Sequence, residues 1–156
     1  MPKDVDRESR IAFDTALYGN VKRLDGSNVP FYSFFVNIGD NPDVYVIYSH
    51  PGSANIPNAS MINIKTAMQL TVVAKTTSND GSELEYIVSQ IKSIIQPNAA
   101  AQILNIDGFQ VISMDEYNDV FDTYPDSTLK GSDTGAAKMV MERKIFYSLI
   151  LLDKTR

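Results

Sequence analysis

The sequence predicts an α+β fold in which a mostly antiparallel sheet of four to five strands carries two helices on one face. Apolar and polar residues alternate from Ile62 to Ala74, which indicates a long strand with one buried side. From Leu84 to Ile95 the apolar residues recur three and four positions apart, as in an amphipathic helix. The order of helix, strands, helix and strands lets neighbouring strands pair directly, with the helices as a second layer.

The first 36 residues are expected to form a helix followed by a β-hairpin. Apolar residues fall on one helical face between Asp4 and Leu17, and Gly19 stands where a left-handed residue ends a helix. Asp25-Gly26 lies between the β-prone runs 21–24 and 29–36, an arrangement typical of a hairpin turn. The sheet would therefore begin with these short strands.

The middle of the chain is expected to contain a strand, a long loop and the capped second helix. The run 43–48 is rich in Val and Tyr and predicts a strand. Residues 49–60 have no hydrophobic period, so this loop is expected to bind a partner or to be ordered by one. Ser82 and Glu85 have the spacing of a capping box, and Pro97 follows the last apolar residue of the helix.

The C-terminal third is expected to supply the last two strands. Residues 109–116 and 139–152 are rich in β-branched and aromatic residues and predict strands. Residues 117–135 between them are expected to form a mostly irregular excursion. The expected helices and strands, with the loops between them, would then account for the whole chain.

Composition indicates one soluble globular domain spanning residues 1–156. The chain is 44% hydrophobic and 21% charged, and it has no run near the ~20 apolar residues that a membrane span requires. Its charged N-terminus argues against a signal peptide. The absence of cysteine excludes disulfides, thiolate nucleophiles and the usual zinc sites, so we expect an intracellular origin.

Negative charge is concentrated between Asp107 and Asp133. Seven acids and one base, Lys130, give this segment a charge of −6, whereas the rest of the chain sums to +1. Asp115 and Glu116 are neighbours in a predicted strand and so point to opposite faces, which favours a solvated surface over paired acid/base catalysis. No run of Lys and Arg is longer than two, which argues against a stripe that binds nucleic acid phosphates.

Residues that could carry chemistry are few. His50 is the only histidine, and without cysteine it would need several carboxylates to hold a metal. Ser53 follows a glycine but lacks the second glycine of a nucleophile elbow. Asp115, Asp119 and Asp122 have the composition of a calcium loop without the spacing or central glycine of an EF-hand. We therefore expect no catalytic residue, cofactor or metal.

Eight aromatic residues occur in the strand and loop regions and could stack on nucleic acid bases. Base-stacking proteins pair such aromatics with Lys and Arg, which these regions lack. Core packing, or burial at a protein interface, is therefore favoured. The residues are Tyr32, Phe34, Phe35, Tyr45, Tyr48, Tyr117, Phe121 and Tyr124.

The order of elements carries a resemblance that covers nearly the whole chain. It rests on the helix end at 16–19, the proline-aromatic strand entry at 29–34, the strand 66–74 with the helix 83–91, and the segments 107–112 and 143–150. On these segments the sequence resembles the tail terminator proteins of long-tailed bacteriophages, also called tail completion or tail-to-head joining proteins, and the related minor tail proteins of prophages. The segments 49–60 and 117–135 depart from the compact family pattern.

This resemblance implies a structural virion protein without enzymatic activity or cofactor. Copies of the chain would form a ring, hexameric in the family, at the head-proximal end of the tail tube, where the ring ends tube polymerisation. The implied partners are further copies, the tail tube protein and a neck or head-completion protein. DNA would pass through without specific binding, no membrane would be involved, and the protein would be made in the host bacterial cytoplasm and incorporated at the tail and neck of the virion.

We expect two groups of residues to act in such a ring. The acidic segment would line or border the channel, where repulsion between like charges keeps DNA from adhering to the wall, or would form a solvated outer loop. The long loop would contact a neighbouring molecule. The acidic residues are Asp115, Glu116, Asp119, Asp122 and Asp126, and the loop residues are His50, Pro51, Asn55 and Ile56.

Two other classes of function remain open from the sequence. Another head-completion or neck connector ring would be equally oligomeric and free of catalysis, and its assembly partner would distinguish it. A small ferredoxin-like enzyme or ligand-binding module could hold a pocket near His50 and the tyrosines. A monomer that a small molecule stabilises against heat would favour that class.

Overall fold

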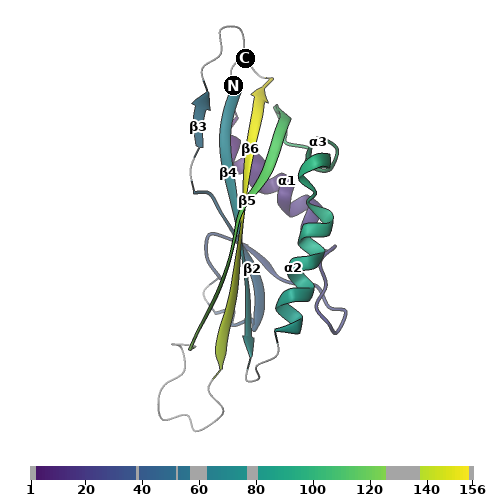
Figure 1. Ribbon diagram of the computed structural model, residues 1–156, viewed down its shortest axis with the longest axis vertical. Coiled ribbons are helices and arrows are strands. Elements are labelled where there is room, and N and C mark those ends of the chain that lie inside the picture. Colours follow the sequence, from purple (N-terminus) through teal and green to yellow (C-terminus); the bar gives the residue numbers. More distant parts are fainter. Residues whose placement is uncertain are drawn as a thin grey trace.

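The computed structural model describes residues 3–37, 39–51, 53–56, 63–76, 81–125 and 138–154. These residues form two layers, a twisted sheet seen nearly edge-on in Figure 1 and helices that all lie on one of its faces. The predicted α+β class is confirmed, as is the placement of two main helices on one face. The helices are α1 (Val5–Leu17), α2 (Ser82–Ile94), the 3-10 turn Pro97–Ala99 and the short α3 (Ala100–Ile103).

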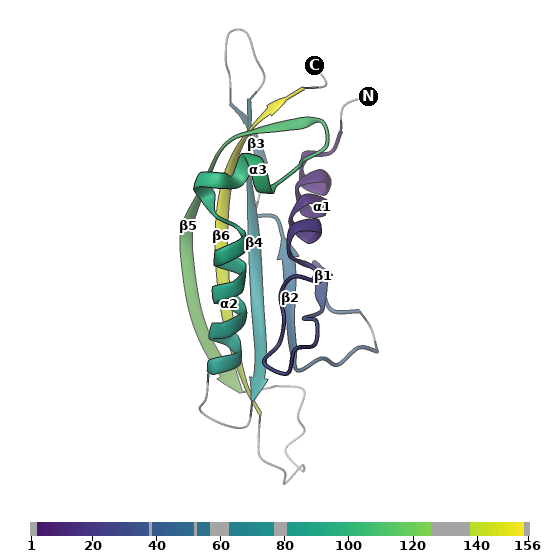
Figure 2. The same ribbon diagram turned by 90° about the vertical axis from the view of Figure 1, so that its right-hand side faces the viewer.

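The sheet has six strands, five of them in the continuous order β1-β2-β4-β6-β5, with β3 added to β4. All neighbouring strands are antiparallel except β1 and β2, which are parallel. Figure 2 shows the three longest strands running side by side along the molecule, with β5 at one lateral edge and β1 near the other. The strands are β1 (Phe31–Ser33), β2 (Val44–Ser49), β3 (Ser53–Ile56), β4 (Asn63–Thr76), β5 (Phe109–Pro125) and β6 (Met139–Asp153).

The core lies between α1, α2 and the covered face of the sheet. Strand residues alternate between the two faces, so the pairing of Met68 with Tyr147 and of Leu70 with Ile145 places four large side chains on the covered face. All four are buried, and the apolar stripe of α2, including Ile91, packs against the same cluster. The predicted alternation along β4 and the predicted helical period of α2 are both confirmed.

The helix ends follow from local hydrogen bonds. Asp4 caps α1 by accepting hydrogen bonds from the backbone amides of Asp6 and Arg7 at 3.0 and 3.3 Å. The predicted capping box at the second helix is wrong in position, because the N-cap residue is Gly81 and no side chain caps the helix. Ser82 is instead the first residue inside α2.

The predicted hairpin at residues 21–36 is reduced to a single bridge between Lys22 and Asn28. On the outer side of this bridge, the Gln90 amide of α2 binds both backbone groups of Lys22. The Lys22 amide donates to Gln90 Oε1 at 2.9 Å, and Gln90 Nε2 donates to the Lys22 carbonyl at 2.8 Å. A side chain on the helix thus takes the place of a partner strand, and only Phe31–Ser33 of the expected second run enters the sheet.

Two segments expected to be irregular are strands in the structure. Ser53–Ile56 forms β3 on β4, so the expected loop 49–60 is interrupted by a strand. Strand β5 continues to Pro125 because β6 is long enough to pair with it as far as Met139. Two β-bulges, between Val111 and Ser113 and between Glu116 and Asn118, let β5 follow that strand. The remainders of both expected loops, 57–60 and 126–135, lie outside the described residues.

Truncating a buried side chain of β6 should destabilise the fold strongly. Leu149 is completely buried between β4 and β5, so Leu149→Ala should lower the free energy of unfolding by about 2–5 kcal/mol through lost transfer energy and a residual cavity. Urea denaturation measures this. Leu24→Ala is the matched control, because Leu24 is 59% exposed, and it should change stability by less than about 0.5 kcal/mol. Equal losses in both variants would contradict this core.

Candidate functional surface

The structure divides the acidic residues of β5 between the two faces of the sheet. Through the register with β6, Glu116 and Asp119 lie on the face that the helices cover, whereas Asp115 and Asp122 lie on the open face. Asp126 lies outside the described residues. The acidic cluster expected from the sequence is therefore two separate groups with different neighbours.

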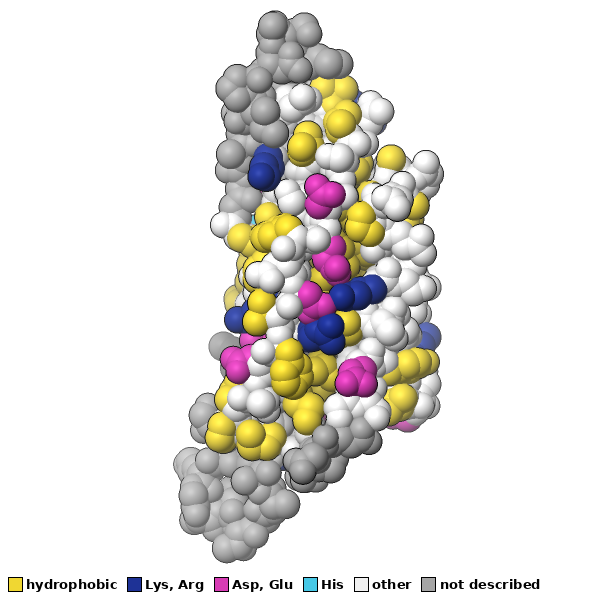
Figure 3. Space-filling model, viewed as in Figure 1, with side chains coloured by type: hydrophobic (Ala, Val, Ile, Leu, Met, Phe, Trp, Pro, Cys, Tyr) yellow, Lys and Arg dark blue, Asp and Glu magenta, His cyan; other side chains and the backbone are white. Residues whose placement is uncertain are grey.

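Asp119 is the centre of an ion-pair group that joins β5, β6 and α2. Arg143 binds it with two hydrogen bonds, from Nε to Oδ1 at 2.6 Å and from one terminal nitrogen to Oδ2 at 2.8 Å. Lys92 of α2 lies 2.5 Å from Oδ2 of Asp119 and 3.4 Å from Oε1 of Glu116. In Figure 3, basic side chains lie among acidic ones at the middle of this face, between the edge strand and the helices.

This geometry changes the protonation behaviour of the group. The hydrogen bonds from Arg143 and then Lys92 outweigh partial burial and lower the pKa of Asp119 to about 2. The same contacts raise the pKa values of Lys92 and Arg143. Two carboxylates and two cations then balance, so Glu116 and Asp119 add no net charge to the surface. Their contact with α2 and β6 serves to join the two layers.

The sequence contains one indication of this ion-pair group that our prediction missed. Arg143 has the same parity along β6 as the buried Ile145 and Tyr147, so its charge points toward the covered face and requires a partner there. The two bulges in β5 each reverse which residues face inward. The two reversals cancel at Asp119, so alternation from Phe109 identifies this partner but would place Asp115 rather than Glu116 on the covered face.

The open face of the sheet has no helix over it among the described residues. Its charged strand residues are balanced in sign, because three bases face three acids. Glu142 is held there by Lys144 at 3.3 Å and by the Tyr124 hydroxyl, which donates at 2.8 Å. The face therefore presents no net positive surface. The bases are Lys65, Lys75 and Lys144, and the acids are Asp115, Asp122 and Glu142.

His50 is buried between the sheet and α1. Its Nδ1 lies 3.3 Å from the Ala67 carbonyl oxygen and 3.8 Å from Asp6 Oδ1, and its Nε2 has no hydrogen-bond partner among the described residues. Asp6 also accepts a hydrogen bond from the Thr66 hydroxyl at 2.9 Å. The contacts attach the end of β2 to the start of α1. No group of three or more metal-ligating side chains occurs in the described part of the chain.

The other residues of the expected interface loop are only partly placed. Pro51 is exposed next to His50. Asn55 and Ile56 belong to β3 and pair with Ile64 and Asn63 of β4, but their side chains, like that of Ser53, lie outside the description. Their expected contact with another molecule stays a prediction.

Exposed apolar side chains occur at the two lateral edges of the sheet, and those of β5 project from both faces, with Phe121 on the covered side and Val120 and Tyr124 on the open side. We call the first group, all on β5, the β5 patch, and the second group, on α1 and after β1, the α1–β1 patch. The sequence assigned the aromatic residues to the core or to an interface without distinguishing them. The structure does so, because Tyr48 is buried whereas both patches contain exposed rings. The β5 patch is Ile112, Tyr117, Val120, Phe121 and Tyr124, and the α1–β1 patch is Ile11, Tyr18, Phe34 and Phe35.

Phe34 adopts a strained backbone conformation in the α1–β1 patch. Its φ of 72° is positive, which is rare for a bulky residue and costs on the order of 1–3 kcal/mol. Two hydrogen bonds hold it, from the Phe34 amide to the Tyr48 carbonyl and from the Phe35 amide to the Ser33 carbonyl, both 2.9 Å. The second bond closes a three-residue turn around Phe34. The turn leaves the Phe34 side chain 54% exposed, with the Arg10 guanidinium 4.8 Å from its ring centre.

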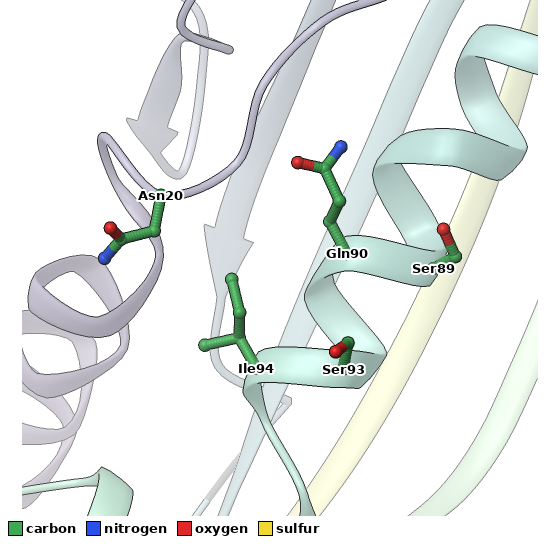
Figure 4. A pocket seen from close by; sticks show the side chains of 5 residues that line it. All are labelled: Asn20, Ser89, Gln90, Ser93 and Ile94. Atoms are coloured by element: carbon green, nitrogen blue, oxygen red, sulfur yellow. The ribbon is translucent and has the colours of Figure 1, made fainter.

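One depression lies beside α2, away from these surfaces. A shallow depression of about 350 Å³ between the end of α1 and α2 is lined by Asn20, Ser89, Gln90, Ser93 and Ile94 (Figure 4). It contains no charged group, and Gln90 is already bonded to Lys22. None of the described helices has the length and apolar character that a membrane crossing requires.

Comparison with known proteins shows a likeness of fold only. No protein-family model matches the sequence, and no curated protein matches it. The fold is similar to that of a chain in the solved structure described as "Virion of native gene transfer agent (GTA) particle". The TM-score is 0.53 and the match covers 94% of this chain and 91% of that chain. Sequence identity is 8%, so the likeness is one of fold alone.

Breaking the ion-pair group should cost stability in a pH-dependent way. Lowering the pKa of Asp119 from 3.8 to about 2 corresponds to about 2 kcal/mol of stabilisation. Because the folded-state pKa is depressed, this stabilisation is present above pH 3.8 and is lost as the pH falls to about 2. Asp119→Asn should therefore be less stable than the wild type at pH 7, and the difference should vanish near pH 2.

Urea denaturation of both proteins between pH 7 and pH 2 measures this difference. Asp115→Asn is the matched control, because Asp115 is exposed on the same strand and has no ion pair in the described structure, and it should behave like the wild type throughout. A difference between Asp119→Asn and the wild type that persists unchanged at pH 2 would show that the ion pairs are not its source.

Proposed function

We propose that this protein is a structural component of a virion that forms a ring with copies of itself at the head-proximal end of a tail tube. The observation that supports this most is the fold, which is shared over 94% of the chain with a chain of a virion particle. The resemblance of the sequence to tail terminator proteins adds the position in the tail. In this proposal the ring ends tube polymerisation and joins the tail to the neck.

The surface features support assembly rather than catalysis. Exposed apolar side chains concentrate at two edges, while the depression beside α2 is shallow and the described residues contain no cluster of metal ligands. Grouped apolar residues on a surface mark sites of protein association. A ring closes when one surface of each copy binds a different surface of the next, and two distinct patches meet that requirement.

The open face of the sheet fits the wall of a passage for DNA. It carries equal numbers of acids and bases among its described strand residues, so it offers no net positive charge to phosphates. In this proposal Asp115 and Asp122 border the passage, whereas Glu116 and Asp119 lie on the covered face and are neutralised. The channel role expected for the whole acidic segment is thus proposed for these two residues only.

The ring can be tested directly with the purified protein. Sedimentation velocity and negative-stain electron microscopy should show closed rings at raised protein concentration or in the presence of the tube protein of the same particle. Polymerising tubes should end at capped tips when the chain is added. A connector of the head-completion class would form rings but leave tube growth unchanged. A chain that stays monomeric alone and with tubes would contradict the proposal.

Reversing the charge of the two open-face acids should create affinity for DNA. Asp115→Lys with Asp122→Lys changes the balanced face to a positive one, so labelled duplex DNA should bind at low salt, at least about tenfold tighter than to the wild type. Fluorescence anisotropy measures binding, which should weaken steeply as salt rises. Asp25→Lys with Asp107→Lys, a matched change in two loops, should bind much more weakly. Equal binding by both double variants would argue against a special role of the open face.

A further inference from the structure

We infer that the α1–β1 patch of one copy packs against the β5 patch of the next copy, and that this single contact builds the ring. The inference rests on the proposed function, because that function requires the occupant of both patches to be another copy of this chain. The structure supplies what the proposed function leaves open, namely which surfaces meet and in which direction.

The β5 edge is built for association. Among the described residues β5 pairs only with β6, so its other side is an edge of the sheet. Two bulges and the acids of β5 limit pairing of this edge with another strand through the backbone, as is usual for edge strands. The edge also displays large apolar side chains, including Phe121 at 56% exposure, so a partner would bind through side chains.

The α1–β1 edge presents a pre-formed apolar projection. The turn around Phe34 holds its ring outward at a backbone angle that phenylalanine rarely adopts, and Phe35 beside it is 64% exposed. Two backbone hydrogen bonds fix the turn, so little conformational freedom is lost when a partner covers the rings. Strained residues that the surrounding structure holds in place are typical of binding sites.

Charge favours the same pairing of edges. Arg10 lies over the Phe34 ring and pairs with no carboxylate among the described residues. On the covered side of β5, the acids Glu85, Glu116 and Asp119 outnumber the bases Lys92 and Arg143, which leaves one net negative charge. If copies continue edge to edge with their helices on the same side, Arg10 faces this group.

The two patches lie at opposite ends of the strand order, on β1 and β5. They also differ in composition, so a contact between them joins two unlike surfaces. A contact between different surfaces repeats from copy to copy and closes into a ring when the rotation allows it. The inferred contact is therefore directional.

Two variants that each disrupt one patch test the direction. Phe34→Gly with Phe35→Ser removes the two rings at the turn of the α1–β1 patch, and glycine tolerates the positive φ, so the fold is preserved. Ile112→Thr with Phe121→Thr removes two of the five side chains of the β5 patch while keeping β-propensity. Each variant alone should associate at least about 100-fold more weakly than the wild type. Mixed together, they should form a dimer with one copy of each and nothing larger, because one intact patch of each kind remains.

Sedimentation velocity measures the assemblies, and circular dichroism verifies that each variant is folded. Leu24→Ser is the control, since Leu24 is 59% exposed but belongs to neither patch, and it should assemble like the wild type. Wild-type rings together with undiminished assembly of either variant, or with no dimer in the mixture, would overturn the inferred contact and leave the proposed function intact. A wild-type chain without rings, alone and with tubes, would overturn both.

Discussion

The pairing of β6 with β4 on one side and β5 on the other is the interaction on which the rest of the structure depends. It runs along the whole of β6, so the alternation of that strand determines which face each residue of its neighbours occupies. Tyr147 and Leu149 mark the covered face, where the helices complete the core. Arg143 has the same orientation, and Asp119 and Lys92 must therefore meet it there. The covered face is apolar at one end and joined by ion pairs toward the other.

Periodicity in the sequence was sufficient to predict the elements that bury a continuous stripe. The α+β class, α1, α2, β2, β4 and β6 are confirmed because each has enough apolar residues at the right spacing to be held by the core. The extension of β5 to Pro125 could not be predicted, since most of its outer half is exposed and its pairing is dictated by β6. The predicted hairpin is limited to one bridge, since Phe31–Ser33 of its second run pairs with β2, which local sequence does not indicate.

The candidate surface was predictable in composition but not in arrangement. The sequence indicated that the aromatic residues belong to the core or to an interface, yet the same residue types serve both purposes. Only the strand order shows that Tyr48 is central while Phe121 lies on an edge. The acidic residues present the same difficulty, because two bulges determine which of them face the helices. The local sequence gives the chemical character of these residues, whereas the pairing of strands distant in sequence determines which residues surround them.

The edges and the open face of the sheet are linked by geometry. If copies join from β1 to β5 with their helices on the same side, all open faces point in one direction around the closed ring. An inward direction would line the passage with sheet and leave the helices outside, where other proteins can reach them. Each copy in such a ring would present the same open-face charges to the passage, so their combined effect on a passing polyanion would be larger than that of one subunit. In the proposed ring, the balance of acids and bases on that face would keep passing DNA from binding to the wall, since a small excess of lysine in one subunit would become a ring of positive charge.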